Sequence, residues 1–426
     1  YLKSKGINKI NQVVITHGDF DHCGEIINLI KKFYMKVDHS IGYPVCQQPN
    51  VSGFGEWYAK TGLCDMHVNN CGNPFDDEQF LLNTTAIEKE VIETFAPYYG
   101  IPKGKEWGFV TNSGTDGNMH GIYFGAKILQ KKTGKLPIVY ISKEAHYSSS
   151  RICDVQNLET RMIDFDKNGS MDLECLKKSI VKDRPALVVA ALGSTFMGAT
   201  DDIKAIKNIM EESNLPAYYI HVDAALFGGY LPFTKYNDLV SMEKQGYDSI
   251  AISGHKFFGI DEPCGLFLAT KEVIESQTAA KVEYLHNDMP LISCSRSGLA
   301  PLKFYWIIKY LGFEKLKEEA ELMLEHTEYF QKKLDEIGYP AWHTKYSNTI
   351  FFKRPSQWIC EKYSLANGFL KDYGGELSHV VVMQHVRENI IDEFIEEFEL
   401  CGAFFLYALF SLLQSPPVCG INTFIV

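Results

Sequence analysis

The most informative stretch of this chain is SGHK (residues 253–256), together with the upstream apolar run YYIHV (218–222) that ends on Asp223. A lysine amine can hold an aldehyde as a Schiff base, and a carboxylate can keep a pyridine nitrogen protonated so that the ring accepts electrons. Lys256 and Asp223 fit these two requirements. The pair therefore predicts a site for pyridoxal 5'-phosphate.

Composition limits the function further. The 426 residues are 46% hydrophobic and 22% charged, which is enough for one large core and a smaller domain. A formal net charge of −11 without a Lys/Arg block disfavours nucleic-acid binding and leaves a small molecule as the expected partner. Eleven cysteines without a C-x-x-C pair, no recognisable signal peptide and no membrane span predict a cytoplasmic protein.

Strand-like and helix-like runs alternate along the middle of the chain, as expected of a parallel sheet covered by helices. Each strand-like run ends in polar residues, and open α/β sheets bind ligands at the carboxyl ends of their strands. From about Pro301, a helical stretch (313–337) precedes short strands near 349–352 and 380–382, which predicts a smaller α+β domain. The four strands predicted for the sheet are IVYIS (138–142), LVVAA (187–191), YIHV (219–222) and SIAIS (249–253).

A loop of small residues, TNSGTDGN (111–118), precedes a predicted helix over residues 119–130. The small residues let the backbone approach a ligand, Ser113 and Thr115 offer hydroxyls, and a helix N-terminus offers free N–H groups to an anion. Such loops are more often simple helix caps. The order of this loop relative to Asp223 and Lys256 favours a phosphate cradle.

Two further residues follow predicted strands. His146 comes after the strand 138–142, where its imidazole could stack on a flat aromatic ring; the alternative is a histidine bonded to nearby backbone. Thr195 comes after the strand 187–191, in a segment that could also be only a turn. Both are expected at the same rim of the sheet as Asp223 and Lys256.

Eight motifs occur in one order: IGYP (41–44), NNCG (69–72), WGFVTNSGTDGNMHG (107–121), YISKEAHYS (140–148), LGSTFMGATDDI (192–203), HVDAALFGGYLPF (221–233), SGHKFFGIDEPCG (253–265) and SRSG (295–298). Through these motifs, residues 41–400 resemble the pyridoxal-phosphate-dependent histidine decarboxylases of bacteria, within the group II amino-acid decarboxylases. The resemblance implies an α/β protein of fold type I, with a mainly parallel seven-stranded sheet flanked by helices and a smaller C-terminal α+β domain. It also implies a homodimer or a higher even oligomer.

The resemblance implies roles for most site residues. The cofactor phosphate would be held by Ser113, Gly114, Thr115, Ser253 and His255. Lys256 would hold the cofactor aldehyde, Asp223 would pair with the pyridinium, and His146 and Ala225 would lie on opposite faces of the ring. A general acid must protonate the product carbon, and the resemblance suggests a tyrosine or a histidine near residues 282–286, of which Tyr284 is the candidate. The predicted catalytic residues are Lys256, His146, Asp223 and Tyr284, and the predicted cofactor-binding residues are Ser113, Gly114, Thr115, Asn118, His146, Thr195, Asp223, Ala225, Ser253, His255 and Lys256.

The implied reaction is decarboxylation of an L-amino acid, with L-histidine to histamine and carbon dioxide as the first hypothesis. A serine or aromatic L-amino-acid decarboxylase stays open, because the residues of the substrate pocket are not identified. Arg296 could bind a carboxylate, brace the dimer or form a structural ion pair. No metal is predicted: Cys64, His67 and Cys71 lack a fourth ligand for a structural zinc site and are interpreted as packed residues.

The two ends of the chain depart from the family. Residues 1–36 resemble the metal loop of metallo-β-lactamase-fold proteins through His17, Asp19, Asp21 and His22, but one short loop cannot supply a complete catalytic zinc site. A non-functional fragment is predicted, with a metallohydrolase-like or DNA-uptake module and an inactive chimera of fused or frame-shifted genes as alternatives. The predicted division is 1–38 (fragment), 39–75 (N-terminal segment of the decarboxylase), 76–299 (large cofactor-binding domain), 300–400 (small C-terminal domain) and 401–426 (unmatched apolar tail).

Overall fold

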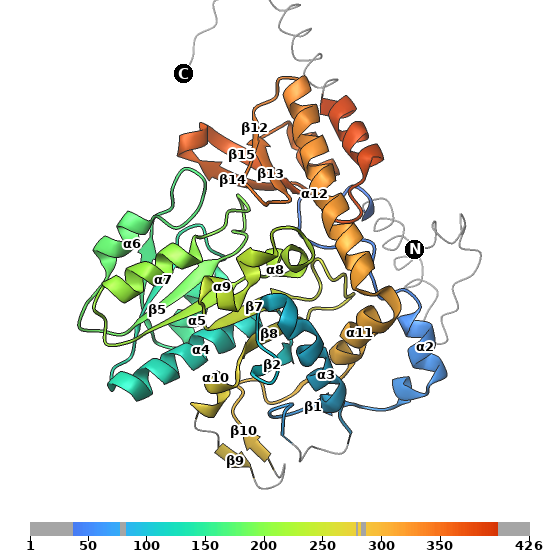
Figure 1. The fold of residues 1–426 in the computed structure, drawn as a ribbon. Coiled ribbons are helices and arrows are strands. Elements are labelled where there is room, and N and C mark those ends of the chain that lie inside the picture. Colours follow the sequence, from blue (N-terminus) through green and yellow to red (C-terminus); the bar gives the residue numbers. More distant parts are fainter. Residues whose placement is uncertain (1–36, 77–81, 278–279, 283–286, 399–426) are drawn as a thin grey trace, which may run out of the picture.

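A seven-stranded sheet, called the large sheet below, forms the centre of the molecule (Figure 1). The computed structural model describes residues 37–76, 82–277, 280–282 and 287–398. Strand β8 runs antiparallel to both of its neighbours, and the other adjacent pairs are parallel. The spatial order is β2 (Glu106–Thr111), β8 (Gly265–Thr270), β7 (Ser249–Ser253), β6 (Tyr218–Asp223), β5 (Ala186–Ala191), β3 (Ile138–Ser142) and β4 (Glu159–Ile163).

Burial on both faces explains why the sequence predicted these strands. All residues of β3, β5 and β7 are buried, and parallel strands covered on both faces read as continuous apolar runs. Successive residues of β3 alternate between the faces, with Tyr140 in one core and Val139 and Ile141 in the other. The predicted α/β sheet is confirmed, and its four predicted strands correspond to β3, β5, β6 and β7 with ends shifted by one residue at most.

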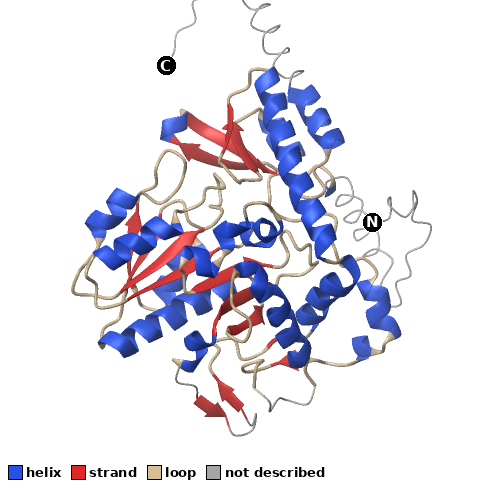
Figure 2. Cartoon of the chain, in the orientation of Figure 1, coloured by secondary structure: helices blue, strands red, loops and turns tan. Residues whose placement is uncertain are grey.

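Helices cover both faces of the large sheet (Figure 2). One face carries α4 (Gly114–Thr133), α5 (Ser148–Val155) and α10 (Lys271–Glu275). The opposite face carries α3 (Thr85–Phe95), α6 (Leu173–Ser179), α7 (Ile203–Glu212), α8 (Phe227–Tyr230) and α9 (Met242–Gln245).

A small antiparallel sheet follows the long helix α12 (Phe313–Glu336) (Figure 1). This helix matches the predicted one over residues 313–337, and its Phe330 and Leu334 join the core of the small sheet. The preceding helix α11 (Leu299–Trp306) buries Phe304 in a core of the large sheet. The predicted second α+β unit is confirmed, with the strand order β12 (Ala341–His343), β13 (Thr349–Lys353), β15 (Gly375–Val381) and β14 (Ala366–Leu370), and with helices α13 (Gln357–Lys362) and 388–398.

The segment that precedes α3 lies outside the large sheet and the small sheet. Cys64 and His67 are exposed there, so the interpretation of these two as packed residues is wrong. They belong to a short 3₁₀ turn (Leu63–Asp65) and the loop after it, where only the neighbouring Leu63 packs against a core cluster. Within the described ranges, no group of three or more His, Cys, Asp or Glu side chains is placed to hold a metal ion, and no helix is long and apolar enough to cross a membrane. The remaining elements are α2 (Phe54–Lys60), the strand pair β1 (Asn69–Asn70) and β11 (Arg296–Ser297), and the pair β9 (Ala280–Val282) and β10 (Asn287–Met289).

Candidate active site

Glycines bring helix α4 unusually close to the large sheet. A Cβ atom added at Gly117 would lie 2.9 Å from the Cβ of Ala251, and one added at Gly121 would lie 2.2 Å from Nδ1 of His221. Because these positions carry no side chain, the helix can lie directly on strands β6 and β7. The helix begins at Gly114 and not at residue 119 as predicted, because this packing outweighs the low helix propensity of glycine.

The first turn of α4 meets the end of β7 at the predicted phosphate site. A Cβ atom added at Gly114 would lie 2.4 Å from Oγ of Ser253. Ser113 caps the helix, since its Oγ accepts the N–H of Asp116 at 3.1 Å, and Thr115 is exposed on the first turn. The first N–H groups of a helix have no intrahelical acceptor, so this meeting point suits a phosphate.

Asp223 and Lys256 lie at the carboxyl ends of neighbouring strands. Asp223 is the last residue of β6, and its Oδ1 accepts the N–H of Ala225 at 3.2 Å. Lys256 lies in the turn that follows β7. Burial lowers the pKa of the Lys256 amine, and the negative charge of Asp223 opposes that shift. The structure thus brings the predicted pair together around an amine that loses its proton more easily than a solvated lysine.

His146 joins this pair from the loop after β3. Burial lowers the pKa of its imidazole, while Asp223 raises that pKa and Lys256 lowers it, so the three groups lie within electrostatic range of one another. Nδ1 accepts the N–H of Ser148 at 3.3 Å and lies 2.7 Å from its Oγ. The proton of the neutral ring is therefore on Nε2. The structure shows the local hydrogen bond and brings His146 within electrostatic range of Asp223 and Lys256; stacking on the cofactor ring stays a prediction.

Asn118 lies deeper than the other predicted cofactor residues. It is buried on α4, and its Oδ1 accepts the Nε2–H of His221 at 3.0 Å. Nδ1 of His221 lies 2.8 Å from Oγ of Ser249, to which the hydroxyl of Tyr219 donates at 2.9 Å. Burial lowers the pKa of His221 to about 3, so this network is neutral and joins α4 to β6 and β7. A cofactor contact by Asn118 stays a prediction.

Thr195, Ala225 and His255 occupy loops at the same edge of the sheet. Thr195 is exposed in the turn after β5, and the carbonyl of Ala225 accepts the N–H of Ser253 at 3.0 Å. Nδ1 of His255 lies 3.3 Å from the carbonyl of Cys264, and burial lowers the pKa of His255. Their cofactor contacts stay predictions. Tyr284, His17, Asp19, Asp21 and His22 lie outside the described residues.

Arg296 forms a structural ion pair. Its Nη2 lies 2.9 and 3.0 Å from the two carboxylate oxygens of Glu88, and its Nη1 donates to the carbonyl of Gly72 at 3.0 Å. Glu88 also accepts the side-chain amide of Asn70 at 2.7 Å and the N–H of Val110 at 2.8 Å. Both charged side chains are at most 1% exposed. Of the three roles left open for Arg296, the structure favours the ion pair.

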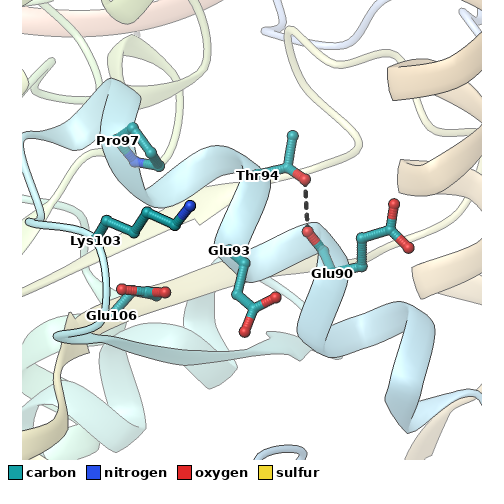
Figure 3. Close-up of a pocket in the computed structure, with 6 residues that line it drawn as sticks. All are labelled: Glu90, Glu93, Thr94, Pro97, Lys103 and Glu106. Carbon is teal, nitrogen blue, oxygen red and sulfur yellow. Dashed lines mark hydrogen bonds between the residues drawn. The ribbon is translucent and has the colours of Figure 1, made fainter.

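A surface cavity of about 480 Å³ lies away from this edge, at the amino-terminal start of β2 (Figure 3). One of its acids, Glu90, pairs with Lys309 at 3.0 Å. None of the described site residues lines the cavity, so we assign it no part in the chemistry. It is lined by Glu90, Glu93, Thr94, Pro97, Lys103 and Glu106.

Glu144 is a site neighbour that sequence reasoning missed. It lies two residues before His146 in the KEAH motif, and its Oε1 accepts the N–H of Met197 at 3.2 Å. Burial raises the pKa of its carboxyl to about 7. An acid next to an expected site histidine was the available signal, but its partner on a distant turn could not be read from the sequence.

Comparisons with known proteins agree with this geometry. The family model of the pyridoxal-dependent decarboxylase conserved domain matches residues 125–339, and that of the metallo-beta-lactamase superfamily matches residues 1–100. The histidine decarboxylase of Vibrio anguillarum is 34% identical over 335 residues, which cover 78% of this chain and 83% of that protein. Serine decarboxylase 1 of Oryza sativa subsp. japonica is 30% identical over 366 residues, 85% of this chain and 72% of that protein. The solved L-methionine decarboxylase of Streptomyces sp. 590 has a TM-score of 0.74 at 20% identity and covers 91% of this chain, with 96% of its own chain covered.

Fold and sequence together define an amino-acid decarboxylase that depends on pyridoxal phosphate. The chain belongs to the pyridoxal-dependent decarboxylase family. The predicted cofactor is confirmed, and the residues present fit it, since Lys256, Asp223 and the cradle at Gly114 lie at one edge of the sheet. The metallo-β-lactamase resemblance is also found, but its match extends beyond the predicted boundary at residue 38.

Proposed function

We propose that this decarboxylase converts L-histidine to histamine and carbon dioxide. The cluster of Lys256, Asp223 and His146 is the observation that carries decarboxylation. The choice of histidine is supported by the identity of 34% to the histidine decarboxylase of Vibrio anguillarum, against 30% and 32% to two serine decarboxylases of Oryza sativa. L-Serine is therefore the second candidate substrate, followed by an aromatic L-amino acid.

Each site residue has a physical task in this proposal. When bound, pyridoxal phosphate supplies an aldehyde that takes up an amine and a ring that accepts the electrons released with carbon dioxide. The lowered pKa of Lys256 favours its uncharged, nucleophilic form. The Asp223 carboxylate can pair with a protonated ring nitrogen, and the neutral ring of His146 can lie flat against an aromatic face. Tyr284 is proposed to donate a proton to the product carbon.

A substrate comparison tests the proposal. Purified protein is supplied with pyridoxal phosphate, and carbon dioxide release is measured with L-histidine, L-serine and the aromatic L-amino acids, with Asp223→Ala as the matched inactive control. We expect the largest kcat/KM for L-histidine and a visible absorption band that borohydride removes. A larger kcat/KM for L-serine would replace histidine by the second candidate. A colourless protein without decarboxylation would overturn the proposal.

The active form is proposed to be a homodimer or a higher even oligomer. Sedimentation velocity of the cofactor-loaded protein tests this assembly when decarboxylase activity is measured across the sedimenting boundary. Full specific activity in a species that sediments as a monomer at all concentrations would contradict it.

The metallo-β-lactamase match favours a second candidate, a metal-dependent hydrolase in the first segment. We propose instead that His17, Asp19, Asp21 and His22 form no working metal site. A catalytic zinc needs three protein ligands in fixed geometry and further groups that orient them, and one short loop cannot supply that arrangement alone. Metal analysis after dialysis, a hydrolase screen and a His17→Ala/His22→Ala variant test this. Stoichiometric zinc and hydrolysis that are both lost in the double variant would show a second function.

A further inference from the structure

The turn that carries Thr195 is a closed unit at the end of β5. The N–H groups of Gly193 and Ser194 both donate to the carbonyl of Ala199, at 2.9 and 2.8 Å. The N–H of Ala199 donates in return to Oγ of Ser194 at 3.0 Å, and that of Gly198 donates to the carbonyl of Ser194 at 3.0 Å. These bonds fix the shape of the turn. The base of the turn is tied to the large sheet, since the N–H of Leu192 donates to the carbonyl of Asp223 at 2.8 Å and the N–H of Asp201 to that of Ala191 at 2.9 Å. The position of its tip, at Phe196 and Met197, depends on contacts with other segments.

The small sheet holds one side of this turn. The carbonyl of Phe196 lies 2.9 Å from Nδ1 of His379 on β15, and the two rings are stacked with centroids 4.9 Å apart. The hydroxyl of Thr344 donates to the carbonyl of Gly198 at 2.6 Å. Met197 is part of a small apolar cluster with side chains of the small sheet. The turn is therefore the place where the small sheet reaches the edge that carries the site.

Glu144 holds the other side of the turn. Its Oε1 accepts the N–H of Met197 at 3.2 Å, and the N–H of Phe196 also favours the ionised carboxylate. Because Glu144 lies two residues before His146, one carboxylate joins the loop of His146 to the turn of Thr195. Charged acceptors bind N–H groups more tightly than neutral ones do.

The ionised carboxylate of Glu144 costs free energy at this position. Glu144 is partly buried, and no cation among the described residues forms an ion pair with it. Burial raises the pKa of its carboxyl from 4.5 to about 7, so its contribution to folding stability falls as the pH rises between those two values. Because the ionised form of Glu144 disfavours folding, the residue is better explained by the backbone N–H groups that it binds than by a contribution to stability.

We infer that Glu144 is a positioning residue, which fixes the Thr195 turn relative to the His146 loop and so couples the small sheet to the cofactor edge. The inference rests on the proposed function, because it assigns the Thr195 turn to the cofactor site. Glu144 acts through the backbone N–H groups of the turn and is not itself a catalytic residue.

Amide hydrogen exchange of residues 193–199 tests the inference without any activity assay. We expect the turn to lose protection in Glu144→Ala and to recover most of it in Glu144→Gln, whose amide oxygen can still accept an N–H. In parallel, the dissociation constant for pyridoxal phosphate should rise about tenfold in Glu144→Ala, the usual size of one lost charge-assisted hydrogen bond. The circular dichroism of the cofactor band should also be weaker in Glu144→Ala than in Glu144→Gln.

Asp248→Asn is the matched control. Asp248 also accepts a backbone N–H, that of Ile220 at 2.7 Å, and burial raises its pKa to about 6, but it lies at the amino-terminal end of β7. This variant should leave the exchange of residues 193–199 and the cofactor band unchanged. Equal changes in Asp248→Asn and Glu144→Ala would reveal a general loss of stability and overturn the inference, as would unchanged protection of the turn in Glu144→Ala.

A pH series replaces Glu144→Ala if that variant does not fold. Protection of the turn in the natural sequence, normalised to the unfolded peptide, should fall as the pH falls through about 7, and Glu144→Gln should show no such step. A step that persists in Glu144→Gln would assign it to another group and overturn the inference. Asp201 is a second carboxyl at the base of the turn: burial raises its pKa to about 6, and it accepts the N–H groups of Ala191 and Met171, both at 2.7 Å. Other titratable or charged groups on the elements near the turn include His146 and His379, whose pKa values burial lowers, together with Lys143, Asp223 and Lys256. If the natural sequence binds no pyridoxal phosphate, the proposed function fails, while hydrogen exchange still decides the role of Glu144.

Discussion

Arg296 and Lys256 are two cations removed from bulk water, and their surroundings differ in a way that separates stability from chemistry. Arg296 contacts Glu88 and Gly72 within 3.0 Å, so its charge is paired with that of Glu88. Lys256 has Asp223 as an electrostatic neighbour, but no described residue forms a hydrogen bond or ion pair with its amine. The first arrangement pairs the charge with a buried counter-charge, and the second disfavours the charged form of the amine.

The residue types match these surroundings. A guanidinium keeps its proton in proteins and suits a permanent bidentate pair, whereas a lysine amine readily changes its pKa when it is buried. A buried pair becomes strongly destabilising when one partner is removed. An amine with few partners can be removed with little effect on folding, although the chemistry that depends on it is lost.

Lys256→Ala should have the largest effect. We expect turnover to fall by more than about 10³-fold, because the covalent partner of the cofactor is lost, while the free energy of unfolding of the cofactor-free protein stays the same or rises slightly. Turnover, visible absorption and chemical denaturation measure this contrast. Lys256→Arg is the control that keeps the charge. Normal turnover in either variant would end the assignment of Lys256.

Arg296→Met should show the opposite pattern. We expect the free energy of unfolding to fall by about 3–5 kcal/mol, because Glu88 is left buried without a counter-charge. The double variant Arg296→Met/Glu88→Gln should recover part of this loss. If Arg296 instead binds the substrate carboxylate, KM will rise while denaturation midpoints do not move.

His146→Ala should lower turnover by about 10²-fold, because the cofactor ring is less well oriented. Retention of pyridoxal phosphate during dialysis should weaken in parallel. His146→Phe keeps a flat ring and should retain the cofactor better than the alanine variant does. Unchanged turnover and retention in His146→Ala would leave only the local hydrogen bonds to Ser148 as the role of this residue.

Asn118→Ala should have the smallest effect, a loss of about 1–3 kcal/mol in stability, because it leaves the Nε2–H of His221 without its acceptor. Turnover at saturating cofactor should stay close to normal. Ser249→Ala, on the other side of His221, is the matched control. A loss of cofactor affinity in Asn118→Ala that is absent from Ser249→Ala would instead support direct contact with the cofactor.

The sequence predicted the parts of this fold that depend on local patterns. Four strands of the seven-stranded large sheet, β3, β5, β6 and β7, were visible because strands covered on both faces are continuous apolar runs, and α12 was visible as a long amphipathic stretch. The start of α4 was missed because its glycines disfavour helix by local propensity, and only the neighbouring strands explain them.

The site divides in the same way. Lys256, Asp223 and His146 each follow a recognisable strand, so their shared edge could be predicted. Glu88 and Arg296 lie 208 residues apart, and nothing local to either residue indicates the other. The contact between Glu144 and Met197 likewise depends on how two loops meet, 53 residues apart.

The antiparallel direction of β8 has a consequence for the loop that carries Lys256. Because β8 returns directly beside β7, Ser253 pairs with Gly265, and the N–H of Gly254 donates to the carbonyl of Cys264 at 2.8 Å. Within the loop that joins β7 to β8 (residues 254–264), the N–H of Ile260 donates to the carbonyl of Gly254 at 3.1 Å and closes a shorter loop around Lys256. The conformational entropy of this loop is therefore lost when the protein folds and not when the cofactor arrives. Cofactor binding at Lys256 meets a backbone that is already ordered, so more of the interaction free energy is left for affinity.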